Sequence, residues 1–258
     1  MVLSVSVKNK RLEEVLHMQA CVRWTRLIAV AFTVLVAIHV GFAQIPGQLA
    51  HDFVAGRVPG PEEIGKSEAD VAAHPEDYQL VRKLAKAYFF QYFGEGRASA
   101  VPKARKALER VLEIQKDDPE TVAYLGALSA LESLRSKDPA VRKAKGEQGL
   151  ELLKRAQQLG PGNGAVLAVT GGSFMFLADD FGTAPLAAQT MEKIRAMMGP
   201  MFPKFSHHGQ QRILLTQGQA YAKMGQGDKA RACFEEGLKV DQESPEASLL
   251  KDELARLK

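Results

Sequence analysis

A short pattern of small and aromatic residues at helical spacing constrains the fold of this chain more than any other feature. Gly218 precedes Tyr221 by three residues, and a turn-forming stretch follows at residues 223–228. Three more residues then recur at four- and three-residue steps: Ala230, Phe234 and Gly237. Residues at this spacing share one face of a helix. Two helices approach to about 8–10 Å only where the side chains between them are small. The pattern therefore predicts a helix, a tight turn and a second helix packed on the first.

The same arrangement recurs upstream, so the chain contains repeats. Each copy has a small residue, a second residue three positions later, and spaced apolar residues in a following helix. The first copy has Ala85 and Tyr88, then Ala104, Leu108 and Val111. The second has Gly126 and Ser129, then Gly149, Leu153 and Ala156. A weaker third copy has Gly171 and Phe174, then Ala187, Met191 and Ile194.

These residues resemble the tetratricopeptide repeat, whose first helix carries Leu-Gly-x-x-Tyr and whose second carries Ala, an aromatic residue and Ala. The resemblance is to exported bacterial members of that family and covers roughly residues 75–247. It implies an all-α fold within residues 61–258, a right-handed α-solenoid of antiparallel helix pairs. The expected units are repeats at 75–120, 121–163, 164–206 and 207–245, and a capping helix at 246–258.

The repeats are longer than the family pattern. Their small residues stand 41, 45 and 47 positions apart, whereas the family repeats every 34 or so residues. We expect the extra length in three turns within the pairs and in one loop after the third pair. These segments are 94–102, 135–148, 178–185 and 198–206. Such insertions lie along one edge of a solenoid, where they are tolerated.

Residues 1–43 are typical of an export signal. Two arginines precede an apolar run over residues 27–40, and Gly41 and Ala43 stand three and one positions before a possible cleavage site. Cleavage there predicts a periplasmic or secreted protein. The alternative is an uncleaved anchor, because the seventeen mostly apolar residues 27–43 reach the lower limit for a membrane span.

The segments on either side of this signal have distinct patterns. The stretch before Met18 is long for a signal, which suggests translation from Met18 as an alternative to Met1. Residues 44–60 are rich in proline and glycine and are expected to form a linker. A helix is expected to follow, over residues 61–74.

Charge and cysteine content exclude some functions. The net charge is +4, but residues 1–43 hold five basic and two acidic residues, which leaves 29 basic and 28 acidic residues. So balanced a chain predicts no nucleic-acid partner. Cleavage would also remove Cys21 and leave Cys233 alone, so no internal disulfide is expected. The helical surroundings of Cys233 predict a buried, unreactive thiol.

No residue pattern predicts catalysis, and we expect a non-catalytic protein with no cofactor and no metal. The chain has no phosphate-binding loop, nucleophile elbow or zinc motif. His207 and His208 are adjacent, and adjacent helical residues do not face each other, so a helix start is expected there. Asp179 and Asp180 are expected to form or cap a turn.

The family resemblance implies that the first helix of each pair lines a concave groove for peptides or partner segments. By register, the groove residues are Arg82, Lys86 and Phe89; Ala123, Ala127 and Ala130; Ala168, Gly172 and Met175; and Arg212, Leu215 and Gln219. The expected groove is small and apolar in its middle and basic toward its ends. Arg82 and Lys86 are expected to receive an acidic group of a partner. Phe89 or Phe90 either faces the groove or is covered by the turn at 94–102.

The sequence therefore predicts a protein–protein interaction scaffold that holds a partner protein or peptide in a helical groove in the cell envelope. The alternative is a periplasmic small-ligand-binding or transporter-accessory protein, in which the long turns close a pocket. Contact with a membrane is expected only through the N-terminal segment, if it is not cleaved.

Overall fold

The computed structural model describes residues 59–95 and 99–257, and every regular element in these ranges is helical. The predicted export signal and most of the predicted linker lie outside the described residues. In chain order the elements are α2 (Pro61–Ala73), α3 (Tyr78–Glu95), α4 (Ala100–Ile114), α5 (Pro119–Arg135), α6 (Pro139–Leu159), α7 (Gly164–Phe176), α8 (Ala178–Phe181), α9 (Ala184–Met198), η1 (Gly199–Lys204), α10 (His207–Lys223), α11 (Gly227–Val240) and α12 (Pro245–Arg256).

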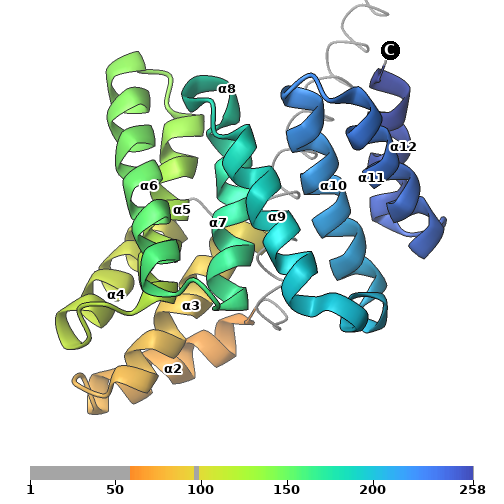
Figure 1. The fold of residues 1–258 in the computed structure, drawn as a ribbon. Helices are drawn as coiled ribbons and strands as arrows, with labels where there is room; N and C mark the ends of the chain where they lie inside the picture. The colour runs from red at the N-terminus through yellow and green to blue at the C-terminus, as the bar shows by residue number, and fades with distance from the viewer. Residues whose placement is uncertain (1–58, 96–98, 258) are drawn as a thin grey trace, which may run out of the picture. The chain divides into compact units, whose positions relative to one another are not determined.

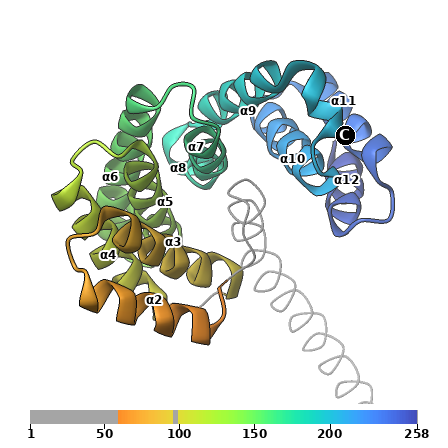
Figure 2. The same ribbon diagram turned by 90° about the horizontal axis from the view of Figure 1, so that it is seen from below.

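The long helices pack as consecutive pairs, which confirms the predicted all-α helix-pair fold. The pairs are α3 with α4, α5 with α6, α7 with α9, and α10 with α11. Figure 1 and Figure 2 show each helix beside its chain neighbour. The helix α2 packs on α3 at one end of the series, and α12 packs on α10 and α11 at the other.

Short polar residues begin many of the helices. The carboxylate of Asp138 accepts hydrogen bonds from the first amides of α6, and the amide oxygen of Asn163 does so for α7. Asp118, Ser206 and Ser244 cap α5, α10 and α12 in the same way. These amides have no partner within their own helix, so each cap satisfies a group that would otherwise depend on water.

Small residues lie where paired helices cross, as the sequence pattern predicts. A methyl group added at Gly149 of α6 would lie 2.9 Å from the backbone nitrogen of Ala130 and 3.0 Å from the carbonyl oxygen of Gly126, both in α5. A methyl at Gly218 of α10 would lie 2.3 Å from the ring of Phe234 in α11. The signature residues therefore set the distance between helices in each pair.

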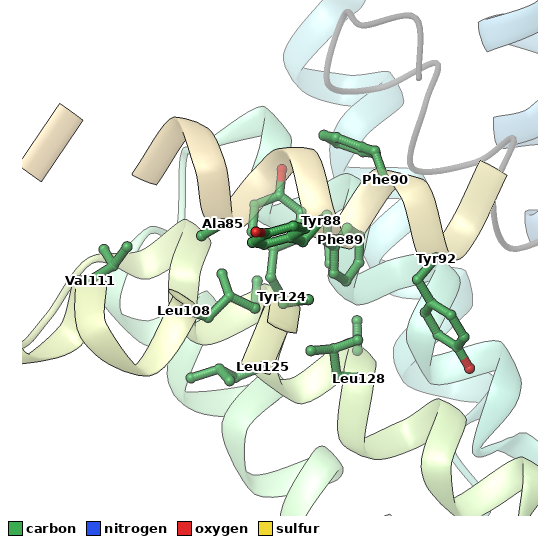
Figure 3. Packing of buried hydrophobic residues seen from close by; sticks show 14 of the residues in the cluster. Ala85, Tyr88, Phe89, Phe90, Tyr92, Leu108, Val111, Tyr124, Leu125 and Leu128 are labelled. Carbon is green, nitrogen blue, oxygen red and sulfur yellow. The ribbon is translucent and has the colours of Figure 1, made fainter. Parts of the chain in front are cut away.

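The aromatic residues of α3 form the centre of the N-terminal core. Tyr88, Phe89, Phe90 and Tyr92 are all buried. The ring of Phe89 lies 4.5 Å, centroid to centroid, from the ring of Tyr124 in α5, and Figure 3 shows Tyr124 reaching from α5 to the aromatic side chains of α3. Rings at such distances contribute about 0.5–1.5 kcal/mol beyond their buried area. Both Phe89 and Phe90 therefore pack in the core.

The extra length of the repeats is more ordered than the sequence suggested. The expectation of a long turn over 135–148 is wrong, because α6 already begins at Pro139 behind its cap Asp138. The segment 178–185 contains the short helix α8, which ends at Gly182 with a φ of 62°. The segment 198–206 contains the 3-10 helix η1. Insertions here add helical structure instead of loop.

The C-terminal helix covers the last pair. Leu250 of α12 is fully buried, and Ala247 is 1% exposed. The same junction contains an ion pair with almost no solvent contact, because Arg212 is 0% and Glu246 is 1% exposed at a distance of 2.9 Å. Both apolar packing and a buried charge pair thus fix α12 on α10. No helix in the described ranges is both long and apolar enough to cross a membrane.

Candidate functional site

The residues predicted to line a groove lie on the first helices α3, α5, α7 and α10, but many of them are buried. Those with almost no exposed surface are Phe89, Ala123, Ala127, Ala130, Ala168, Gly172, Arg212 and Leu215. Those with partly exposed side chains are Arg82, Lys86, Met175 and Gln219. The small residues of this face therefore serve close packing between helices. Of its four partly exposed side chains, the two cations lie on α3.

Arg82 and Lys86 lie within an ion cluster that joins α3 to α5. Arg82 Nη2 lies 2.7 Å and Lys86 Nζ 2.5 Å from the same carboxylate oxygen of Glu120. Arg82 Nε also lies 3.3 Å from Asp118 Oδ2. Two cations thus face two carboxylates, and their formal charges cancel. The side chains of Arg82 and Lys86 keep 23% and 24% exposure, so the cluster reaches the surface.

Glu120 is the centre of this cluster. Burial by itself would raise the pKa of its carboxyl, but the hydrogen bond and charge of Lys86 and the charge of Arg82 offset burial and lower the pKa. Asn163 Nδ2 donates to Glu120 Oε1 at 3.4 Å, so the start of α7 also joins the cluster. Glu120 is therefore ionised at neutral pH and connects three consecutive first helices.

Tyr124 stands one helical turn after Glu120 and contains an unusual group. Its side chain is fully buried, and its hydroxyl has no hydrogen-bond partner in the part of the chain that the structure describes. Lys86 Nζ lies 5.8 Å from the centre of its ring. Burial raises the pKa of the phenol, as does the nearby charge of Glu120. The hydroxyl therefore keeps its proton and is a donor without an acceptor.

The cluster contains more hydrogen-bond donors than its two carboxylates use. Lys86 has three N–H groups and Arg82 five, of which only a few face Glu120 and Asp118. The phenol of Tyr124 adds another. Because the charges already cancel, the arrangement favours a neutral acceptor such as a peptide carbonyl over a free carboxylate, which would compete with Glu120 for the same cations.

The groove residues of α10 contact the capping helix. Arg212 pairs with Glu246, and Gln219 Nε2 donates to Glu253 Oε1 at 2.8 Å. Leu215 belongs to the core shared by α7, α9, α10 and α12. Arg212 and Gln219 therefore hold α12 in place, and sequence register alone did not distinguish this role from partner binding.

Other residues that the sequence singled out have structural roles. His207 starts α10 as expected, and His208 Nδ1 lies 2.6 Å from Glu246. Asp179 and Asp180 lie in α8 and pair with Lys223 of α10 and Arg142 of α6. Within the described ranges no three His, Cys, Asp or Glu side chains gather as a metal site would require.

Comparisons with known proteins agree with this helix-pair arrangement. No protein-family profile matches the sequence, and no curated protein matches it in sequence. The structure is similar to the crystal structure of a thermophilic TPR protein from Thermus thermophilus, with a TM-score of 0.54 over 76% of this chain and 88% of that chain. The fold is that of a tetratricopeptide repeat protein. Sequence identity is 17%, so the similarity concerns the fold alone.

In tetratricopeptide terms, α3, α5, α7 and α10 are the first helices of four pairs, and α12 covers the last pair. The sequence analysis named Arg82 and Lys86 as groove residues, a prediction that stays untested, and did not name their neighbours in this cluster, Glu120, Tyr124 and Asn163. A signal was present, because Glu120 and Tyr124 stand four residues apart on one helix face. Their relation to α3, however, depends on how the helices align, which one sequence does not give.

Proposed function

We propose that this tetratricopeptide-fold protein is a non-catalytic interaction scaffold that binds an extended or helical segment of a partner protein across α3, α5 and the start of α7. The observation that carries the proposal is the hydroxyl of Tyr124, a buried donor without an acceptor beside partly exposed Arg82 and Lys86. A buried unsatisfied hydroxyl costs about 1–3 kcal/mol. A partner carbonyl that accepts from it would recover that cost on binding.

The ordered structure around the hydroxyl supports a recognition role. The ring of Tyr124 is fixed by Phe89 and Phe90, whose centroids lie 4.5 Å and 6.1 Å away. The flexible side chain of Lys86 lies over the ring and is partly exposed. The proposal requires that Lys86 moves aside when the partner binds, so that a carbonyl of the partner reaches the phenol.

The proposal includes the cell envelope as the place of action. Its support is the pattern of residues 1–43, with an apolar run followed by Gly41 and Ala43. Fractionation of cells that express the full chain tests this part separately. Recovery in the cytoplasmic fraction with an intact N-terminus would refute the location and leave the binding site untouched.

The binding site is tested by Tyr124→Phe, which removes the hydroxyl and keeps the ring. The partner is first isolated with the full chain from an envelope extract and identified by mass spectrometry. Loss of one hydrogen bond of about 1.4 kcal/mol would weaken its affinity about tenfold. Tyr88→Phe is the matched control, because the Tyr88 hydroxyl already donates to Glu68. Equal affinity of the Tyr124→Phe variant and the unchanged protein would refute the site.

A further inference from the structure

The end of α9 and the 3-10 helix η1 that follows it expose two large apolar side chains. Met197 is 50% exposed and Met201 is 56% exposed. The other large apolar side chains with comparable exposure in the described ranges are Val141, at 44%, and Leu159, at 37%. Two of these four residues therefore lie four positions apart, Met197 in the last turn of α9 and Met201 in η1.

Each of these methionines has an exposed lysine on the same side of its helix. Lys193 precedes Met197 by four residues in α9, a spacing at which helical side chains are neighbours. Lys204 follows Met201 by three residues in η1, where residues three apart eclipse each other. Neither lysine forms an ion pair with a carboxylate in the described ranges. We call Lys193, Met197, Met201 and Lys204 the methionine ledge.

The backbone beneath the methionine ledge is firmly held. Phe202, next to Met201, is 8% exposed, and the guanidinium of Arg195 lies 5.1 Å from its ring centre. Gln210, which is 5% exposed, donates to the carbonyl oxygens of Pro203 at 3.3 Å and Phe205 at 2.7 Å. The exposure of Met201 is thus a fixed feature of η1, and Met197 lies in the regular helix α9, so neither belongs to a loose loop.

From this arrangement we infer that the methionine ledge is a second docking surface, distinct from the cluster at Tyr124, for an apolar segment of a partner protein that carries acidic residues. Methionine side chains are flexible and polarisable, so they adapt to apolar partners of varied shape. Exposed apolar groups with a charged rim are typical of interaction sites. The two unpaired lysines select acidic residues in the partner by charge complementarity.

The test places the photo-reactive residue p-benzoylphenylalanine at position 201 of the full chain in living cells. The same residue at position 141, which is also exposed and apolar, is the control. After irradiation, the cross-linked peptide is sequenced by mass spectrometry. At position 201 we expect a cross-link to a protein segment that contains both apolar and acidic residues. At position 141 we expect no such cross-link.

Charge reversal then tests the role of the lysines. The double substitution Lys193→Glu and Lys204→Glu should lower the adduct yield at position 201 about fivefold or more. Lys106→Glu with Lys154→Glu, at exposed positions elsewhere, should leave it unchanged. The inference is overturned by equal yields at positions 201 and 141, by unchanged yield after the first reversal, or by adducts only to phospholipid or to a second copy of this chain. None of these outcomes depends on Tyr124.

Discussion

The crossing of α5 and α6 offers a sharp test of the packing, through Gly149→Ala. The added methyl would lie 2.9 Å from the nitrogen of Ala130 and 3.0 Å from the oxygen of Gly126. Ordinary contacts of a methyl are about 0.5 Å longer, and backbone atoms cannot rotate away as a side chain does. The two helices must therefore separate, at a cost near the upper end of the 1–3 kcal/mol range for overpacking.

An opposing effect comes from helix propensity, because alanine is favoured over glycine by about 1 kcal/mol in a helix interior. The net expectation is a loss of about 2 kcal/mol, or about 4–8 °C in Tm for a domain of this size. Gly65→Ala in α2 is the matched control, since nothing lies within 4 Å of its added methyl. That variant should gain up to about 1 kcal/mol.

Urea unfolding followed by circular dichroism measures both variants, and the slope of free energy against urea should stay unchanged. If Gly149→Ala unfolds at the same urea concentration as the unchanged protein, or at a higher one, the close crossing does not limit stability and the packing argument fails.

Three further measurements test individual side chains. Glu246→Gln should lose about 3 kcal/mol at pH 7, because Arg212 and His208 lose their carboxylate. Burial favours a raised pKa for Glu246, but His208 and Arg212 lower it overall; the stability from this carboxyl is present above its unfolded pKa of about 4.3 and is lost as pH falls through the folded value. Denaturant titrations should therefore show the two proteins converging below about pH 4, and a gap that persists at pH 2 would contradict this. Burial raises the pKa of Cys233 to about 11, so native labelling by iodoacetamide at pH 8 should be about a hundredfold slower than in urea; comparable rates, read by peptide mass spectrometry, would show an accessible thiol. Tyr124→Phe should raise the free energy of unfolding by about 1 kcal/mol by removing an unsatisfied hydroxyl; a clear loss would mean that the hydroxyl has a partner.

The helix pairs could be predicted from the sequence because their signals are local. Gly218 and Phe234 occupy one face each of two helices joined by a short turn, and the structure places them in contact. Caps such as Asp138 are also local signals. The start of α6 was nevertheless missed, because the sequence pattern placed this helix only from Gly149 onward, by Gly149, Leu153 and Ala156. In the structure the earlier part of α6 is also helical, and the ring of Phe181 lies over Gly146 as the backbone of α5 lies against Gly149.

The candidate site was predictable only in part, because its pairings are long-range. Arg82 was expected to receive an acidic group of a partner, and this stays a prediction. Its ion pair with Glu120, 38 positions away in the sequence, was not indicated by the sequence pattern. Arg212 is an extreme case, since its carboxylate comes from Glu246 in the capping helix. A single sequence shows which residues share a face of each helix. Which face of one helix meets which face of another depends on how all the helices pack together.

The buried pair of Arg212 and Glu246 also bears on how such an array can evolve. In a repeat array each unit contacts only its neighbours, so a helix pair added after α11 would take the place of α12. Such an added pair would need an acidic side chain that contacts Arg212 and a hydrogen-bond acceptor for Gln219. In this structure Glu246 and Glu253 of α12 provide them. An added pair with only an apolar face would leave the buried charge of Arg212 without its carboxylate. Charge as well as shape therefore limits which helices can follow α10 and α11.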